Sequence, residues 1–178
     1  MRRLSFTACR RFLPVAALSG FLLGHPGPAA AGPAEDLALY LKLFPSTRSI
    51  GIIYSDPRNE APVAALRSAA ETLKLKLLPV KVASLQQFPQ ALRGLQPQVD
   101  TVWVLDDPLY ANLDAWKYFI MFSLRYQLKT VVPNRRAVEL GGLCCFPESG
   151  KALINKKVLG LLGLEPGPQA AEVSYYGG

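Results

Sequence analysis

Histidine, cysteine and long hydrophobic runs are scarce in this 178-residue sequence. The single histidine is His25, and the three cysteines are Cys9, Cys144 and Cys145. Three cysteines, two of them adjacent, cannot build the disulfide framework that staples many small secreted domains. The apolar run near the N-terminus covers residues 12–24, and these thirteen residues are too few to span a bilayer. The sequence therefore predicts a domain that depends on its own hydrophobic core.

The first 31 residues have the composition of an export signal. The apolar run 12–24 precedes small residues in the sequence PAAAGPAED and follows a basic segment. The basic residues of that segment are Arg2, Arg3, Arg10 and Arg11. We predict a signal peptide over residues 1–31, cleaved near Ala31, and a periplasmic or secreted mature chain; a short uncleaved anchor is the alternative. Cys9 lies before the apolar run, which argues against a lipoprotein, and the arginine pairs leave the export route open.

Removal of the predicted leader changes the chemistry that the chain can perform. The leader carries four arginines and no acid, so 16 basic and 13 acidic residues remain, with a net charge of +3. This mild charge, without a basic run interleaved with aromatic residues, argues against nucleic-acid binding. The leader also contains His25, so the mature chain has no imidazole for a catalytic triad or a metal site.

Cys144 and Cys145 are the two cysteines that remain after the leader. Adjacent residues of a strand point to opposite faces of the sheet. We therefore interpret them as buried, small apolar residues. A vicinal disulfide is the alternative in an oxidising compartment.

The rest of the chain, roughly 147 residues, suits one domain. We predict a linker with a short helix over residues 32–47, an α/β lobe over 48–168 and a tail over 169–178. Apolar segments predict five strands, at residues 49–55, 76–82, 100–106, 129–134 and 141–146, and Pro79 places the second at a sheet edge. Amphipathic segments predict helices at residues 61–75, 84–95, 109–127 and 147–163, and the tail has one candidate strand at 172–176. This alternation predicts a single doubly wound, flavodoxin-like, five-stranded parallel sheet with helices on both faces.

Three loops follow strand ends at which such a sheet binds its ligands. Their sequences are SDPRNE after the first strand, DDPLYAN after the third and NRRAVE after the fourth. Asp106 and Asp107 end the third strand, and we predict that Asp107 faces a cleft while Asp106 serves the loop. In that case Asp107→Ala reduces binding and leaves the fold nearly unchanged. If Asp107 only caps the next helix, the substitution costs about 1 kcal/mol of stability with binding intact.

The same acids allow other kinds of site. A phosphoacceptor pocket of Asp56 and Asp107 would need a cation at the end of the fifth strand, where Cys145 and Phe146 stand. The segment PESGKA lacks the first glycine and the Ser/Thr of a phosphate loop. No loop has the regular acidic spacing of a calcium site, so we predict no metal and no cofactor. A carboxylate-based hydrolase stays open, because the sequence does not fix the distance between Asp56 and Asp107.

The predicted helix 109–127 is rich in aromatic residues. Most of its apolar residues fill core positions at helical spacing. They are Leu113, Trp116, Tyr118, Phe119, Phe122 and Tyr126. An exposed edge of this helix would indicate a protein partner or a second copy of the chain.

Five motifs follow one another over almost the whole mature chain: IGIIYSDPRNE, VDTVWVLDD, TVV, VELGGL and PESGK. Their order resembles the second lobe of the substrate-binding proteins of ABC transporters, of the two-lobed type I kind that binds aromatic amino acids. The resemblance implies that Asn59, Asp107 and Gly141 line the cleft between lobes. It departs from the family at Glu60, where serine is common, and at Pro108, where asparagine is common. The first lobe has no counterpart in this sequence.

From the loops and the resemblance together, we predict a set of ligand-binding residues and no catalytic residues. The set is Ser55, Asn59, Glu60, Asp107, Tyr110 and Gly141. The resemblance implies an exported, non-enzymatic binding protein for a small solute, for example an amino acid, or for a protein partner. An ABC permease, a sensor protein or a second copy of the chain would complete the half-cleft. A periplasmic signalling or structural interaction module is the alternative function.

Overall fold

The computed structural model describes residues 32–148, 151–167 and 173–177, and the predicted leader lies outside them. The α-helices are Pro33–Leu43 (α1), Glu60–Thr72 (α2), Phe88–Leu95 (α3), Leu113–Arg125 (α4), Arg135–Glu139 (α5) and Lys156–Leu161 (α6). The strands are Ser49–Tyr54 (β1), Lys76–Lys81 (β2), Thr101–Trp103 (β3), Lys129–Val131 (β4), Cys144–Glu148 (β5), Lys151–Asn155 (β6) and Val173–Tyr176 (β7). Short 3-10 turns are Pro57–Asn59 (η1), Leu85–Gln87 (η2), Gln96–Gln98 (η3) and Pro108–Tyr110 (η4).

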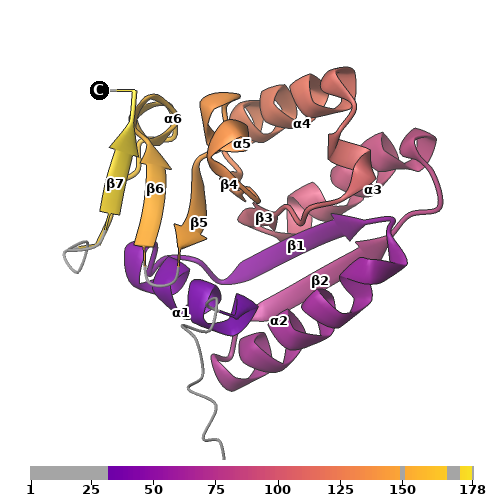
Figure 1. The fold of residues 1–178 in the computed structure, drawn as a ribbon, viewed down its shortest axis with the longest axis horizontal. Helices are drawn as coiled ribbons and strands as arrows, with labels where there is room; N and C mark the ends of the chain where they lie inside the picture. Colours follow the sequence, from indigo (N-terminus) through magenta and orange to yellow (C-terminus); the bar gives the residue numbers. More distant parts are fainter. Residues whose placement is uncertain (1–31, 149–150, 168–172, 178) are drawn as a thin grey trace, which may run out of the picture.

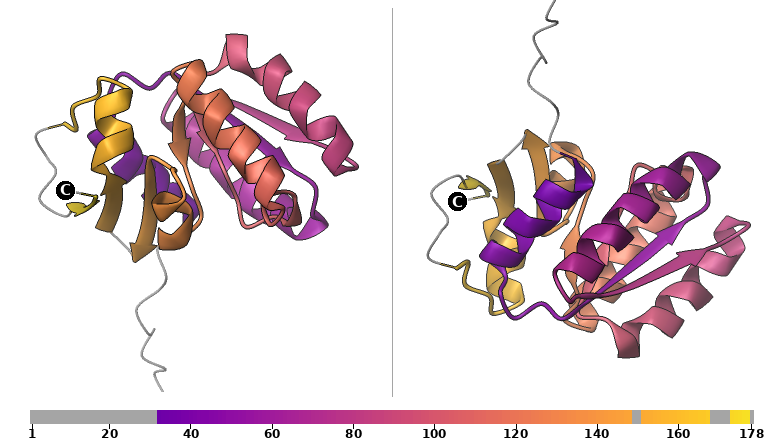
Figure 2. Two further views of the ribbon diagram at one scale, coloured as in Figure 1. Left: turned by 90° about the horizontal axis from the view of Figure 1, so that it is seen from above. Right: turned by 90° about the horizontal axis from the view of Figure 1, so that it is seen from below.

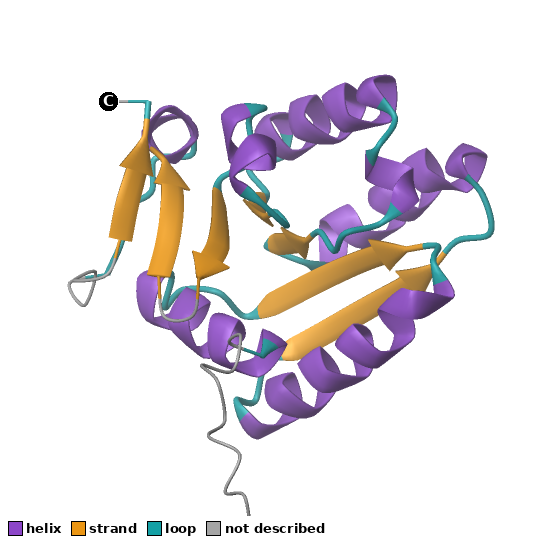
Figure 3. Cartoon of the chain, viewed as in Figure 1, coloured by secondary structure: helices purple, strands orange, loops and turns teal. Residues whose placement is uncertain are grey.

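The strands form one sheet in the order β2-β1-β3-β4-β5-β6-β7 (Figure 1). The pairs are parallel except for β5 with β6, which is antiparallel. The first five strands have the flavodoxin-like order, and helices lie on both sides of the sheet (Figure 3). The predicted doubly wound α/β fold class is therefore confirmed. Pro79 lies opposite Ile52 in the edge strand β2, as the sequence predicts.

The strand count and the last helix differ from the prediction. The sheet has seven strands rather than five. Residues 151–155, predicted as part of a helix, form β6, and α6 begins only at Lys156. Leu153 pairs with Cys145 and Ile154 with Cys144, so pairing with β5 overrides the helix propensity of this segment. The candidate strand of the tail forms as β7.

Two further local predictions are corrected. Pro147, expected in the first turn of the last helix, lies in β5 where the pairing with β6 changes register. A proline has no N–H for a regular ladder, so such an irregularity is where a strand accepts it. The segment NRRAVE is not a loop but contains α5, because the Asn134 side chain accepts a hydrogen bond from the Ala137 N–H and caps the helix.

Two hydrophobic clusters cover the two faces of the sheet. On one face, α3, α4 and α5 pack on Ile53, Val102 and Val132. On the other, α1 and α2 pack on Ile52 and Val131. Viewed from below, α1 lies across the later strands and α2 across β1 and β2 (Figure 2). The short helix expected in the 32–47 segment is thus part of the core, with Leu37, Tyr40 and Leu43 almost fully buried.

A buried polar cluster closes the amino ends of the strands. The ammonium group of Lys129 in β4 donates a hydrogen bond to Thr47 Oγ1 at 2.9 Å and lies 3.3 Å from Asp100. Asp100 accepts hydrogen bonds from the Arg48 and Ser49 backbone N–H groups at 2.8 and 3.1 Å. These contacts fix the loop between α1 and β1 to the strands beside it.

No helix in the described part of the chain is long and apolar enough to cross a membrane. Helix α4 is amphipathic, as predicted, and its aromatic residues mostly face the core. Its outer surface exposes Leu113, Met121 and Tyr126.

Candidate functional site

The loops that follow β1 and β3 meet at the carboxyl edge of the sheet through Asp107. Its carboxylate accepts five hydrogen bonds of 2.7 to 3.0 Å. The donors are the Ser55 N–H and hydroxyl, the Asp56 N–H, the Asn59 amide and the Leu109 N–H. Asp107 is 5% exposed, so a charged group is buried here and is paired with donors from two loops. The carboxylate joins segments that lie about 50 residues apart in the sequence.

These donors also set the titration of Asp107. Burial alone would raise the pKa of this carboxyl. The backbone N–H groups of Asp56, Leu109 and Ser55 outweigh that effect and hold the pKa below its ordinary value. Asp107 is therefore a buried anion at neutral pH.

The two adjacent acids differ in exposure and in their partners. Asp107 is buried and bonded to both loops, whereas Asp106 is exposed. The strand β3 itself ends at Trp103, earlier than predicted, and Asp107 lies in the loop that follows. The donors around Asp107 offset the cost of burying its charge. Contact of Asp107 with a ligand stays a prediction.

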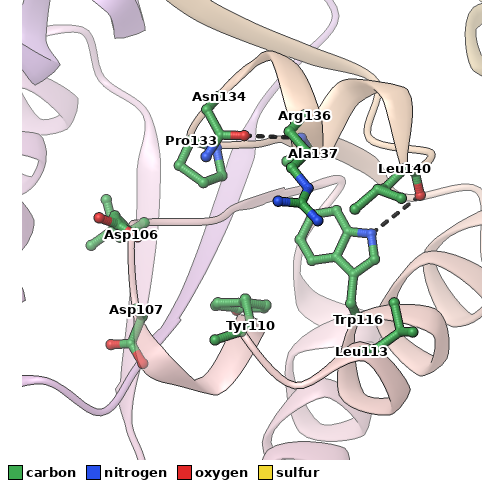
Figure 4. Close-up of a pocket in the computed structure, with 12 residues that line it drawn as sticks. Asp106, Asp107, Tyr110, Leu113, Trp116, Pro133, Asn134, Arg136, Ala137 and Leu140 are labelled. Carbon is green, nitrogen blue, oxygen red and sulfur yellow. Dashed lines mark hydrogen bonds between the residues drawn. The ribbon is translucent and has the colours of Figure 1, made fainter.

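A cavity of about 470 Å³ lies beside this cluster, between the loop after β3 and helix α5 (Figure 4). We call it the first cavity. Its wall includes Asp106, Asp107, Tyr110, Trp116, Arg136 and Leu140. Parallel strands of a doubly wound sheet bind ligands at this edge, and the volume suits a small molecule.

Two aromatic side chains form the apolar part of the first cavity. The Tyr110 hydroxyl donates to the Ile53 carbonyl at 3.2 Å, and burial raises the pKa of this phenol, with the charge of Asp107 as a smaller cause. The Trp116 indole N–H donates to the Leu140 carbonyl at 3.2 Å (Figure 4). The two rings pack edge to face with centroids 6.2 Å apart. Their polar groups are thus bonded within the protein, and the rings are fixed in place.

Charged groups of both signs reach the first cavity. Arg136 in α5 directs its guanidinium group toward the middle of the cavity (Figure 4). Within the described residues no carboxylate forms an ion pair with Arg136, whereas its neighbour Arg135 pairs with Glu139 at 3.1 Å. The exposed Asp106 stands on another part of the wall. The cavity therefore offers a free guanidinium group and a carboxylate around two rings.

Of the six ligand-binding residues predicted from the sequence, four lie at or behind the first cavity and two lie elsewhere. Asp107 and Tyr110 line the first cavity, and Ser55 and Asn59 bond to Asp107 behind it. Glu60 is exposed and pairs with Lys81 of β2. Gly141 has a φ of 105° and lies against Ile120, where a Cβ would come within 2.9 Å of a side-chain carbon. Neither Glu60 nor Gly141 is among the residues that line the first cavity.

Sequence reasoning missed Trp116 and Arg136 as candidate site residues. Trp116 was predicted as core from its helical spacing, and it is both buried and part of the wall. Arg136 lies in the segment NRRAVE, which was singled out as a loop at the correct edge of the sheet. The signal that could have found Arg136 is that α5 begins soon after β4, so its first turn lies at the same edge of the sheet.

A second, smaller cavity of about 170 Å³ adjoins the first. Both share Leu105, Asp106 and Pro133, so Asp106 lies between them. Pro33 and Asp36 of α1 form one side of this second cavity. Burial, with a smaller effect of Glu35, raises the pKa of Asp36 to about 6.

The described residues contain two buried thiols, both in β5. Cys144 and Cys145 are free thiols, and they pack in the clusters on opposite faces of the sheet. Burial raises the pKa of Cys145 to about 11 and raises that of Cys144 as well. In the described ranges, no three His, Cys, Asp or Glu side chains converge as a metal site would require.

The fold is similar to that of solved substrate-binding proteins. An ABC domain in complex with L-Trp from Streptococcus pneumonia matches with a TM-score of 0.71 at 19% identity, over 81% of this chain and 60% of that chain. A substrate binding protein with adhesive properties from Clostridium difficile, in its ligand-free, open structure, matches with a TM-score of 0.67 at 20% identity, over 79% and 58%. A conserved domain protein from Vibrio cholerae O1 biovar El Tor matches with a TM-score of 0.70 at 16% identity, over 80% and 59%.

At these identities the similarity concerns the fold. The chain spans about three fifths of the length of each of these structures. No protein-family model and no curated protein matches the sequence.

Proposed function

We propose that this chain is an exported, single-lobe solute-binding protein of the ABC-transporter type, with its ligand in the first cavity. The observation that carries the proposal is the 470 Å³ cavity at the carboxyl edge of the sheet, whose wall combines two aromatic rings with an arginine and an aspartate (Figure 4). Ligands of open α/β sheets bind at this edge. The fold of the similar substrate-binding proteins supports the same place and kind of activity.

The lining of the first cavity suits a free amino acid. The Arg136 guanidinium group, with no ion pair in the described residues, can bind a carboxylate in bidentate fashion. Asp106 can accept hydrogen bonds from an ammonium group, and the rings of Tyr110 and Trp116 offer an apolar surface to a side chain. A neighbour in fold that binds L-Trp supports this class of ligand.

The remaining parts of the proposal concern partners. A single lobe covers only one side of a ligand, so a permease, a sensor protein or a second copy of the chain is proposed to cover the other.

Ser55 and Asn59 would act by holding Asp107, and roles for Glu60 and Gly141 rest on the family resemblance alone. We propose no catalytic activity, since the mature chain would lack histidine; a signalling module is the alternative with the same cleft.

Binding of amino acids to matched variants tests the proposal. The protein is screened with the twenty L-amino acids by thermal shift, and hits are measured by calorimetry. Arg136→Ala should weaken binding about tenfold, as expected when a charged hydrogen-bond partner is lost. Arg135→Ala is the control, because it removes the same charge from the adjacent residue, which pairs with Glu139 instead.

Two results would contradict the proposal. One is a screen in which no amino acid raises the melting temperature. The other is equal weakening by both arginine substitutions, which would indicate a general effect of charge rather than contact in the cavity.

A further inference from the structure

The second cavity is built by a helix that lies outside the predicted lobe. The first turn of α1 brings Pro33 and Asp36 to the carboxyl ends of β3 and β4. Trp103, Val131 and Phe146 form most of the opposite wall. The cavity therefore exists only where α1 meets the sheet, and it is separate from the wall that α5 gives to the first cavity.

Asp36 is a half-buried carboxylate with no partner among the described residues. Across the described residues, no group donates a hydrogen bond to its side chain and no cation forms an ion pair with it. Its nearest charged neighbour on α1 is another acid, Glu35. A carboxylate partly removed from water in this way is stabilised by a cation that enters the cavity.

The remaining wall of the second cavity is aromatic and acidic. The rings of Trp103 and Phe146 are stacked, with centroids 5.9 Å apart and planes inclined by 18°. Asp106, which is exposed, adds a second carboxylate from the loop after β3. Aromatic rings and carboxylates together favour organic ammonium groups, because both attract the cation and the rings also contact its carbon chain.

We infer that the second cavity is a subsite for an alkylammonium group, held between Asp36 and Asp106 against the rings of Trp103 and Phe146. The inference rests on the proposed function in one respect, namely that the subsite helps to select the ligand. A ligand that fills both cavities then carries a cationic end in this subsite. Because Asp106 lies between the cavities, such a ligand reaches from Arg136 in the first cavity to Asp36 in the second. A small divalent metal fits less well, since it prefers six or more oxygen ligands.

The two tryptophans of the chain provide one reporter for each cavity. Trp116 lines the first cavity and Trp103 the second. Their indole N–H signals can be followed separately by ¹⁵N NMR in the full chain, and Trp116→Phe assigns them. The probe is n-propylammonium chloride, and 1-propanol is the uncharged probe of the same length.

Propylammonium should shift the Trp103 signal in a saturable manner, and 1-propanol should not. Asp36→Asn should weaken this binding about tenfold, because a charged hydrogen-bond acceptor is lost. Glu35→Gln is the control, since it removes the same charge from the adjacent, exposed residue of α1. Asp106→Asn is a second variant that leaves α1 unchanged, and it should also weaken binding.

Three outcomes would overturn the subsite. These are a Trp103 signal that does not move, equal shifts with 1-propanol, and equal weakening by Glu35→Gln and Asp36→Asn. The Trp116 signal tests the first cavity separately, with L-amino acids as probes. If amino acids leave Trp116 unchanged while propylammonium still shifts Trp103, the proposed function fails and the ammonium subsite is supported.

Discussion

At the scale of single residues, Asp107 shows what burial patterns reveal and what they omit. The change from apolar residues to two carboxylates marks the loop after β3 and the edge at which both cavities lie. It did not show which carboxylate is buried, because the five donors come from residues distant in sequence and from the turn that follows. Periodicity describes one segment at a time, whereas this contact depends on how two loops meet.

Replacement of Asp107 is therefore expected to destabilise the fold, contrary to the expectation from the sequence. Asp107→Ala leaves the Ser55, Asp56 and Leu109 N–H groups without their acceptor, which should cost about 3 kcal/mol of unfolding free energy or more. Asp106→Ala, at the adjacent exposed position, should change it by less than about 0.5 kcal/mol. Urea denaturation of both variants measures the difference. Equal stabilities would show that Asp107 does not hold the loops together.

Asp36 should make stability depend on pH in the opposite sense from a paired carboxylate. Its pKa is raised to about 6 in the folded chain, above the ordinary 3.8, so folding favours the protonated form. The stability that this raised pKa contributes to the folded chain is present below pH 4 and is lost as pH rises through 6. Because the group is half-buried and partly screened, we expect Asp36→Asn to gain only about 1 kcal/mol at pH 7.

Denaturation curves at pH 4 and pH 7 measure this effect in Asp36→Asn and in the parent chain. The gain should shrink toward zero at pH 4, where the parent carboxyl is protonated. A gain that is the same at both pH values would mean that the effect does not come from the titration of Asp36.

At the scale of elements, strands β1 to β4 could be predicted from the sequence. The strand β6 and the packing of helix α1, near the two ends of the described chain, could not. Strands β1 to β4 have β-branched, apolar sequences, and they lie within one to three residues of the predicted bounds. Segment 151–155 has a composition that suits a helix, and pairing with β5 and β7 on its two sides makes it a strand. In the same way, the sequence predicts that α1 is helical but does not show that it packs on the sheet.

The packing of α1 predicts a cost for changes outside the 48–168 segment. Leu37 is fully buried between α1 and the sheet, so Leu37→Ala should reduce the unfolding free energy by about 3 kcal/mol. Lys42→Ala, on the exposed side of the same helix, should change it by less than about 0.5 kcal/mol. Thermal and urea unfolding compare the two variants. A neutral Leu37→Ala would mean that α1 is only a linker.

At the scale of the whole molecule, the sheet and its two clusters form one lobe. The similar solved structures are longer, and this chain spans about three fifths of each. The candidate site lies on an open edge of one sheet, so no hinge between lobes is available within the described residues. The motif order predicts a single lobe, but it does not predict the two cavities, whose walls are built by side chains from several separate helices, strands and loops.

A single lobe should not change its size when it binds a ligand. A domain of about 147 residues has an expected radius of gyration of about 15 Å. Small-angle scattering should give the same radius, within about 1 Å, with and without a saturating amino acid found in the screen, because hinge closure needs two domains. An increase with ligand would instead reveal a second copy that covers the cleft.

The two adjacent thiols of β5 provide a separate labelling site on each face of the sheet. Cys144 packs in the cluster with α1 and α2, and Cys145 in the cluster with α3, α4 and α5. A thiol-specific reagent can reach either sulfur only when the helices on that side move away. Two rates of labelling at neighbouring atoms therefore measure, separately and in the native protein, how often each layer of helices opens.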